Sequence, residues 1–390
     1  MPTGIRKTYI PYMCDHALAL EAALQALGVP AEILPPPDEE TLAMGRELCL
    51  GRECLPLFVA IGDILRRARR PDFEASRATY FMPTTCGPCR FGQYRTSLRQ
   101  LLDEAGLNEM TIVSPNAANG YQGMSDQPQR FRRLAWQGIV CVDLLLKLRY
   151  QYRPIERHAG DADRAYWASL DKVVAAMHDG GGRHAARAMA WAGEQFAALE
   201  VDPKGDRRPW IGILGEFYLR ANTFTNPDLA RLVEQLGGRV WVAPMLEWFY
   251  FSVWGAQAHA RRAGRPGAWL KSRLVEGVQR YDEERLLRPL REQLTFAHES
   301  PIGELMDNAR PYYEPLLGTE AALSVGKAVD FARHGLNGVI NILPFSCMPG
   351  LVVTGLAEAI RADHARLPWL DVTYDAQGGT NLQTRLEALL

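Results

Sequence analysis

Cysteine is the residue type whose placement in this chain most strongly suggests chemistry. The sequence contains seven cysteines, and five of them stand in loops that lead into expected helices, namely Cys14, Cys54, Cys86, Cys89 and Cys347. Helix N-termini expose backbone N–H donors and carry positive partial charge, which lowers the pKa of a thiol and stabilises a thiolate or an anionic cluster. The placement therefore predicts a site built from thiolates.

Several kinds of site would use such thiolates. Ligands drawn from separated loops, with few histidines nearby, suit an iron–sulfur cluster better than a catalytic zinc ion. A structural Cys₄ zinc site normally shows two Cys-x₂-Cys pairs, and only Cys86 and Cys89 have that spacing, which also fits a thioredoxin-like redox pair. Structural core cysteines are a further interpretation, so the spacing alone leaves these alternatives open.

Length and composition limit the class of protein. The chain has 390 residues, with Lys+Arg 44 against Asp+Glu 45 and a formal net charge of -1. Neither nucleic acid nor an anionic membrane is an expected partner, because there is no basic excess to neutralise it. The first residues lack a secretory signal, and the apolar window 338–360 is interrupted by polar residues and prolines. We expect a soluble, cytoplasmic protein, in which a disulfide framework is not expected.

The first part of the chain alternates strand and helix patterns. The predicted strands cover residues 7–13, 31–34, 79–82 and 110–113. Such alternation indicates a parallel sheet covered by helices, and it predicts an N-terminal α/β domain over residues 1–125. In open parallel sheets the loops that carry ligands gather at the carboxyl ends of the strands.

The pattern is helical and then alternates again. Residues 126–205 are expected to form a helical connector, and residues 206–390 a C-terminal α/β domain with a helical insertion at about 250–317. Its predicted strands cover 209–214, 239–243, 338–343 and 370–374. The predicted fold is thus α/β, with two Rossmann-like parallel-sheet domains. Because Cys347 comes from the second domain, a shared site would lie in the interdomain cleft.

Longer motifs surround these cysteines in a fixed order. They are Tyr12-Met13-Cys14-Asp15-His16, Gly51-Arg52-Glu53-Cys54-Leu55-Pro56, Met82-Pro83-Thr84-Thr85-Cys86-Gly87-Pro88-Cys89-Arg90-Phe91-Gly92-Gln93-Tyr94, Gly215-Glu216-Phe217-Tyr218, Phe345-Ser346-Cys347-Met348-Pro349-Gly350 and Asp375-Ala376-Gln377-Gly378-Gly379-Thr380-Asn381. Together they resemble the acyl-CoA dehydratase activase-related proteins, a branch of the 2-hydroxyacyl-CoA dehydratase superfamily that also contains the double-cubane cluster proteins. The resemblance spans nearly the whole chain.

The resemblance implies an iron–sulfur cluster held by cysteines between two α/β domains. The family's thiolate positions fall here on Cys14, Cys54, Cys89 and Cys347. These four would hold one [4Fe-4S] cluster. With Cys49 and Cys86 added, six cysteines would hold a double-cubane [8Fe-9S] cluster, whereas the simpler interpretation makes both small buried residues beside a four-cysteine site. Cys141 is expected to be a core cysteine.

The resemblance also implies partners. Low-potential electrons would come from a separate ATP-hydrolysing activase with its own iron–sulfur cluster. This chain has no P-loop of the Gly-x₄-Gly-Lys-Ser/Thr type, in keeping with an ATPase that is a second protein. The acceptor would be a small-molecule or acyl-CoA substrate. The pairing of related subunits in the superfamily suggests a homodimer or heterodimer.

Three polar residues beside the cysteines are candidates for chemistry. His16 could donate a proton or hydrogen-bond to cluster sulfur, or be a surface histidine in the first helical turn. Arg90 could hold an anionic cluster or an acyl thioester phosphate, or pair with a carboxylate such as Asp63. Glu216, at the carboxyl edge of a predicted strand, is a candidate proton donor, and a helix-capping role fits it equally.

These features lead to one preferred hypothesis and two alternatives. The preferred hypothesis is an iron–sulfur oxidoreductase component that takes electrons from an activase and passes them to a substrate in the cleft. One alternative is a non-catalytic Fe–S electron carrier or regulatory subunit, and the other is a structural zinc protein. The ligands of the metal would distinguish the oxidoreductase from the electron carrier, and redox activity would distinguish both of these from the structural zinc protein.

Overall fold

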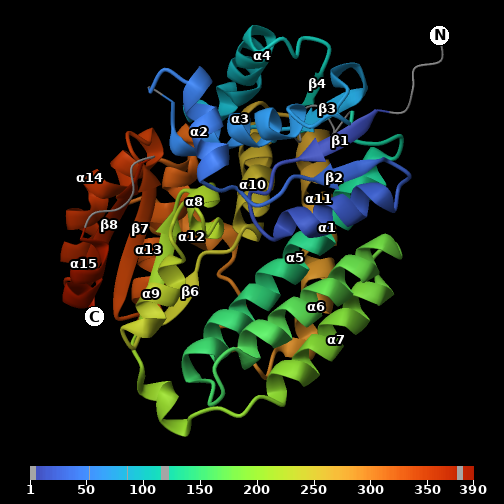
Figure 1. Cartoon of the computed structure of the whole chain (residues 1–390). Helices are drawn as coiled ribbons and strands as arrows, with labels where there is room; N and C mark the ends of the chain where they lie inside the picture. Colours follow the sequence, from blue (N-terminus) through green and yellow to red (C-terminus); the bar gives the residue numbers. More distant parts are fainter. Residues whose placement is uncertain (1–5, 52, 86, 116–122, 376–380) are drawn as a thin grey trace.

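The computed structural model describes residues 6–51, 53–85, 87–115, 123–375 and 381–390, apart from the side chains at positions 204 and 206. Within these residues the strands form two four-stranded sheets, both parallel throughout. The strand order is β2-β1-β3-β4 in the first sheet and β6-β5-β7-β8 in the second (Figure 1). The predicted α/β fold with two Rossmann-like parallel sheets is therefore confirmed.

The first sheet is built by the crossovers that parallel pairing requires. Its strands are β1 (Lys7–Ile10), β2 (Ala31–Ile33), β3 (Ala78–Phe81) and β4 (Thr111–Val113). The connecting helices are α1 (His16–Gln25), α2 (Glu39–Leu48), α3 (Leu55–Ala68) and α4 (Tyr94–Glu104). Strand β1 is shorter than predicted, in keeping with Pro11, which has no N–H to donate to a neighbouring strand.

The second sheet repeats this topology. Its strands are β5 (Trp210–Gly215), β6 (Arg239–Val242), β7 (Gly338–Pro344) and β8 (Trp369–Tyr374). The helices after β5 are α8 (Phe217–Ala221) and α9 (Leu229–Gln235), and α14 (Met348–Asp363) and α15 (Leu382–Leu389) follow β7 and β8. Between β6 and β7 lie α10 (Leu246–Arg262), α11 (Pro266–Leu287), α12 (Ile302–Ala309) and α13 (Glu320–Arg333).

The predicted connector and the predicted insertion share one helical core. The connector contains α5 (Pro128–Tyr152), α6 (Asp161–His178) and α7 (Arg183–Ala197), which lie side by side in Figure 1. Buried apolar residues of these helices pack with residues of α1, α10, α11, α12 and α13 in one continuous cluster. Of the helices that the structure describes, none has the length and apolar character needed to cross a bilayer.

Helix α3 lies between the two sheets. Ile61 and Ile64 pack in the core of the first sheet, whereas Phe58 and Val59 pack in the core of the second. The backbones of α2 and α3 pack directly against each other at Gly45. A Cβ atom added to Gly45 would lie 1.9 Å from the Phe58 carbonyl oxygen. The start of α3, where Cys54 stands, is therefore fixed against both halves of the molecule.

Candidate functional site

The topology brings the predicted site residues to the switch point of each sheet. In the order β2-β1-β3-β4 successive strands are added first to one side of β1 and then to the other, so the switch point lies between β1 and β3. In β6-β5-β7-β8 the switch point lies likewise between β5 and β7. Ligands bind at such points in open α/β sheets. Cys14 follows β1 and Cys89 follows β3, while Glu216 follows β5 and Cys347 follows β7. Each sheet thus contributes two candidate residues at equivalent positions.

Three of the cysteines occupy helix N-caps, as the sequence predicts. Cys54 caps α3, Cys347 caps α14, and Cys89 caps the short 3₁₀ turn Arg90–Gln93 that leads into α4. All three have extended backbone angles, and a proline stands within the first two residues of α3 and α14. The caps direct the positive ends of helices toward the thiols.

Contacts between the two halves hold these loops together. Arg90 donates hydrogen bonds to the carbonyl oxygen and, at 3.0 Å, to the hydroxyl oxygen of Ser346, which directly precedes Cys347. Asn222, just beyond α8, donates to the carbonyl oxygens of Tyr12 and Met13, both at 3.2 Å. Arg90 therefore connects the cysteine loops of the two sheets.

Cys54, Cys89 and Cys347 influence one another's ionisation. Burial is the main cause that raises the pKa of all three thiols, that of Cys89 to about 12. The charge of Cys54 raises the pKa of Cys89 further, and the charge of Cys89 does the same for Cys347. Glu216 raises the pKa of each of them. Thiols from both halves of the chain thus share one buried, electronegative environment.

Two neighbouring side chains hydrogen-bond to these thiols. The Sγ atom of Cys54 lies 2.6 Å from the hydroxyl oxygen of Tyr94. Cys347 donates to Oε1 of Glu320 over 3.8 Å. Burial first, and then the charge of Glu216, raise the pKa of Glu320 to about 8. Glu320 is therefore a carboxyl group held mainly protonated at neutral pH, beside a cysteine.

Glu216 is a helix cap, one of the two roles predicted for it. Its side chain caps α8 by accepting a hydrogen bond from the Leu219 N–H at 2.8 Å. Burial raises its pKa, although the backbone N–H groups of Leu219 and Tyr218 and the charge of Arg220 act in the opposite direction. The same carboxyl acts on three cysteines, so capping fixes it within the candidate site.

Arg220 is the buried cation that faces these carboxyl groups. Its side chain is 7% exposed and donates to the carbonyl oxygens of Gly215, at 3.3 Å, and Pro244, at 3.2 Å. Its charge lowers the pKa of both Glu216 and Glu320. Sequence reasoning missed Arg220 and Glu320, because an arginine in a short helix and a glutamate in a first helical turn are ordinary surface features.

Cys14 has a different set of contacts. Its Sγ atom lies 3.2 Å from Nδ1 of His16, whose Nε2 lies 3.0 Å from Oδ1 of Asp143. His16 is only 8% exposed, so the alternative of a surface histidine is wrong. Burial lowers the pKa of His16, but Cys14 and Asp143 outweigh it and raise that pKa well above the usual value. Asp143 also accepts from the backbone N–H groups of Met245 and Leu246 at the start of α10.

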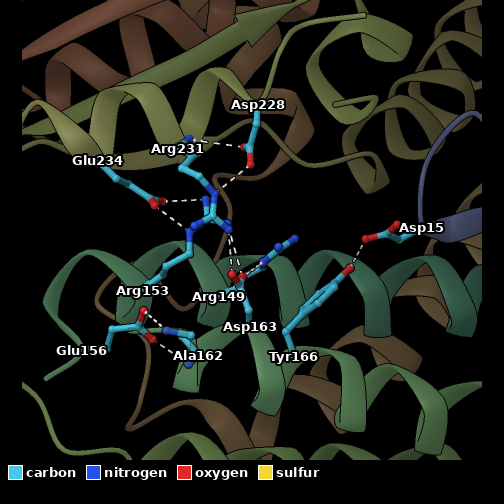
Figure 2. A network of polar contacts seen from close by, with 11 residues as sticks. Asp15, Arg149, Arg153, Glu156, Ala162, Asp163, Tyr166, Asp228, Arg231 and Glu234 are labelled. Carbon is cyan, nitrogen blue, oxygen red and sulfur yellow. Dashed lines mark hydrogen bonds and ion pairs between the residues drawn. The ribbon is translucent and has the colours of Figure 1, made fainter. Parts of the chain in front are cut away.

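A network of polar contacts includes Asp15, the residue that follows Cys14 (Figure 2). Asp15 accepts a hydrogen bond from the hydroxyl of Tyr166 in α6. Directly after α5, Arg153 forms two hydrogen bonds to Glu234 of α9, at 2.6 and 2.9 Å. Asp163 of α6 pairs with arginines of α5 and α9. The helical core is thereby tied to the second sheet and to the Cys14 loop.

A second buried charge cluster positions α13, the helix that begins with Glu320. The Nζ atom of Lys327 lies 2.9 Å from Glu247 and 3.1 Å from Asp330 and also pairs with Glu299. A cavity of about 170 Å³ borders this cluster between α10, α11 and α12. Burial raises the pKa of Glu247 to about 7. These groups lie outside the cysteine site.

The remaining cysteines divide into three cases. Cys49 ends α2, is partly buried in the cores of both sheets, and has a pKa raised to about 12 by burial and then by the charges of Glu53 and Cys54. Cys141 is fully buried in the helical core, as expected. Cys86 lies outside the described residues.

The cysteines of the candidate site and the acidic side chains near them are the possible ligands of a metal ion or cluster. Among the described residues, no three His, Cys, Asp or Glu side chains are arranged to hold a single metal ion. Cys54, Cys89 and Cys347 nevertheless combine burial with mutual repulsion of their thiolates, and a cationic cluster core would relieve both. A cluster also separates its thiolates more widely than one ion does, because iron and sulfide lie between them.

Comparison with known proteins leaves the family open. No protein-family model, no curated protein and no solved structure matches the chain significantly.

Proposed function

We propose that this chain is an iron–sulfur oxidoreductase component whose cluster lies between the two sheets. Cys54, Cys89 and Cys347 would hold the cluster, and Cys14 is the fourth proposed ligand. The observation that carries the proposal is the shared buried environment of three thiols that come from both halves of the chain. Thiolate ligands from separated loops at helix N-termini are suited to such clusters.

The chain's own residues divide the remaining tasks. A cluster bound there would supply one-electron transfer to a small-molecule or acyl-CoA substrate. Glu320 keeps a proton next to Cys347 at neutral pH and can deliver it to a reduced substrate, and Glu216, whose pKa is also raised by burial, shares that environment. Arg220 limits the pKa rise of both carboxyl groups. Arg90 holds the loop that carries Cys89 against the loop that carries Cys347.

His16 is the last of the polar residues to which the proposal assigns a role. Its ring connects the Cys14 thiol to Asp143, which is itself fixed by two backbone N–H groups. A ring nitrogen whose other side is held by a carboxylate has a defined orientation, as in the outer shells of metal sites. His16 would therefore orient Cys14 and hydrogen-bond its sulfur. An ATP-hydrolysing activase is the proposed electron donor.

The test begins with metal analysis of anaerobically purified protein. Iron, acid-labile sulfide and zinc are measured per chain, and an electron paramagnetic resonance spectrum is taken after strong reduction. About four irons would indicate one [4Fe-4S] cluster and about eight a double cubane, in which Cys49 and Cys86 would become ligands. Zinc without iron or sulfide would overturn the proposal.

Single variants then locate the ligands. Replacing Cys54, Cys89 or Cys347 by Ala should remove most of the bound iron, whereas Cys141→Ala is the matched control in the helical core. Cys14→Ala tests the fourth position separately, since Cys14 contacts His16. Iron retained in all of the first three variants would contradict the assignment. A fully cysteine-ligated cluster would favour a carrier, and an iron with a non-protein ligand would favour an enzyme.

A further inference from the structure

The cavity between α10, α11 and α12 has room for a small organic molecule. Its volume is about 170 Å³, and an apolar cavity of about 150 Å³ is enough to hold benzene. The apolar residues that line it are Leu246, Leu287, Ile302 and Leu305, and the acidic ones are Glu247, Glu283, Glu284 and Glu299. Pockets that combine apolar walls with a few polar groups are typical binding sites for small ligands.

Glu283 of α11 lines this cavity and is held by a neutral side chain. Its carboxylate accepts a hydrogen bond from the hydroxyl of Tyr250. Among the residues that the structure describes, no lysine, arginine or histidine forms an ion pair with Glu283. Of the two basic residues that line the cavity, Arg280 pairs with Glu276, and His298 is exposed. Burial is the main cause that raises the pKa of Glu283, and a cation bound beside it would offset that penalty.

Glu247 of α10 lines the same cavity and is only 3% exposed. Its Oε1 atom lies 2.9 Å from Nζ of Lys327, in a geometry that makes no hydrogen bond, and accepts none from any other described residue. The same Nζ atom also pairs with Glu299 and Asp330. A buried carboxylate oxygen without a hydrogen-bond donor is costly, so a ligand that donates to Glu247 would relieve that cost.

The groups around the cavity carry more negative than positive charge. Two lysines pair with three carboxylates there, and Glu283 adds a fourth carboxyl group. The lysines are Lys147 and Lys327, and their partners are Glu247, Glu299 and Asp330. Burial raises the pKa of Glu247 to about 7, although Lys327 lowers it. A cationic ligand would reduce this excess, whereas a neutral or anionic one would not.

We propose that this cavity binds a short aliphatic amine in its protonated form. An ammonium group has three N–H donors, which suits a position where it donates to both Glu283 and Glu247. The alkyl chain would lie against the apolar lining residues. A metal ion fits less well, because among the described residues no three His, Cys, Asp or Glu side chains are arranged to hold one. The site is separate from the cysteine site and does not depend on the iron–sulfur proposal.

Isothermal titration calorimetry of the full wild-type chain with n-butylamine at pH 8 tests the proposal. Butylamine is protonated at this pH, and we expect a dissociation constant of about 1 mM or lower. The comparison ligand is 1-butanol, a neutral molecule of the same size, which should bind at least about tenfold more weakly. Absence of butylamine binding in this range, or equal binding of the two ligands, overturns the proposal.

Single variants then locate the ammonium group. Glu283→Gln keeps an acceptor for the Tyr250 hydroxyl, and it should raise the dissociation constant of butylamine at least about tenfold. Glu247→Gln should weaken binding as well. Glu304→Gln is the matched control, because Glu304 is exposed on α12 and does not line the cavity. A Glu283→Gln variant that is folded by circular dichroism and binds butylamine as tightly as wild type would contradict the assignment. The comparison of the two ligands uses the wild-type chain, so it decides the matter even where a variant fails to fold.

Discussion

Replacing Glu320 by Gln should stabilise the metal-free protein, and increasingly so as the pH rises. The carboxyl group titrates near 4.5 in the unfolded chain and near 8 in the folded chain, because burial and the charge of Glu216 disfavour its ionised form. Between these two values the folded state retains a proton that the unfolded state has lost. Wild-type stability therefore falls as the pH rises from 4.5 to about 8, and the neutral amide of the variant removes this loss.

The magnitude follows from the interval between the two pKa values. Each pH unit contributes about 1.4 kcal/mol, so the interval sets an upper limit of about 5 kcal/mol. Local relaxation and entry of water reduce such penalties. We therefore expect the Glu320→Gln variant to gain about 2–3 kcal/mol over wild type at pH 8, relative to pH 5.

Urea unfolding, followed by circular dichroism at pH 5 and pH 8, measures this difference. Glu358→Gln is the control, since Glu358 is exposed on α14 and its amide should change stability little at either pH. A Glu320→Gln variant that loses the same stability at both pH values would refute the reasoning. It would mean that the Glu320 carboxylate is ionised and needed in the folded protein.

Three other changes test how the site is held in place. Lys327→Met should cost about 3–5 kcal/mol in urea unfolding, because it leaves three buried carboxylates without their shared cation. Gly45→Ala should cost about 1–3 kcal/mol, seen as a lower melting temperature, since the new Cβ would collide with the Phe58 carbonyl oxygen. Although burial alone would raise the pKa of Asp163, Arg231 and neighbouring arginines lower it to about 2, so its stabilisation is present above pH 3.8 and is lost toward pH 2. Asp163→Asn should remove about 1 kcal/mol at pH 7, after solvent screening, and flatten the acid-unfolding curve.

The sheets were predictable because local patterns determine them. The strand before Cys14 and the strand before Cys347 are both short runs rich in β-branched or aromatic residues, and each is followed by a residue that starts a helix. Local residue types therefore locate both strands without long-range information. Placement of the thiols at the carboxyl edge then follows from parallel topology alone. Cys54, Cys89 and Cys347 do stand at the N-caps that the sequence indicates, and Cys89 and Cys347 follow strands β3 and β7.

The polar partners were not predictable in the same way. Arg220 and Glu320 are ordinary in their local sequence, and only the tertiary fold buries them. His16 was open to two interpretations because its partner Asp143 is 127 residues away, and no local pattern connects a first-turn histidine to the middle of a later helix. The shared core of the predicted connector and insertion likewise depends on contacts between distant segments.

The two sheets have the same strand order, and this symmetry explains why the candidate site contains both thiols and carboxyl groups. The loop after the first strand carries Cys14 in one sheet and Glu216 in the other, while the loop after the third strand carries Cys89 and Cys347. Arg90 and Asn222 join loops of the two sheets, and Cys89, Cys347 and Glu216 act on one another's environment, whereas Cys14 contacts His16. Glu216, in one of these four positions, adds a carboxyl group whose pKa is raised by burial to a set that would otherwise hold only thiols, and under the proposed function it could supply a proton.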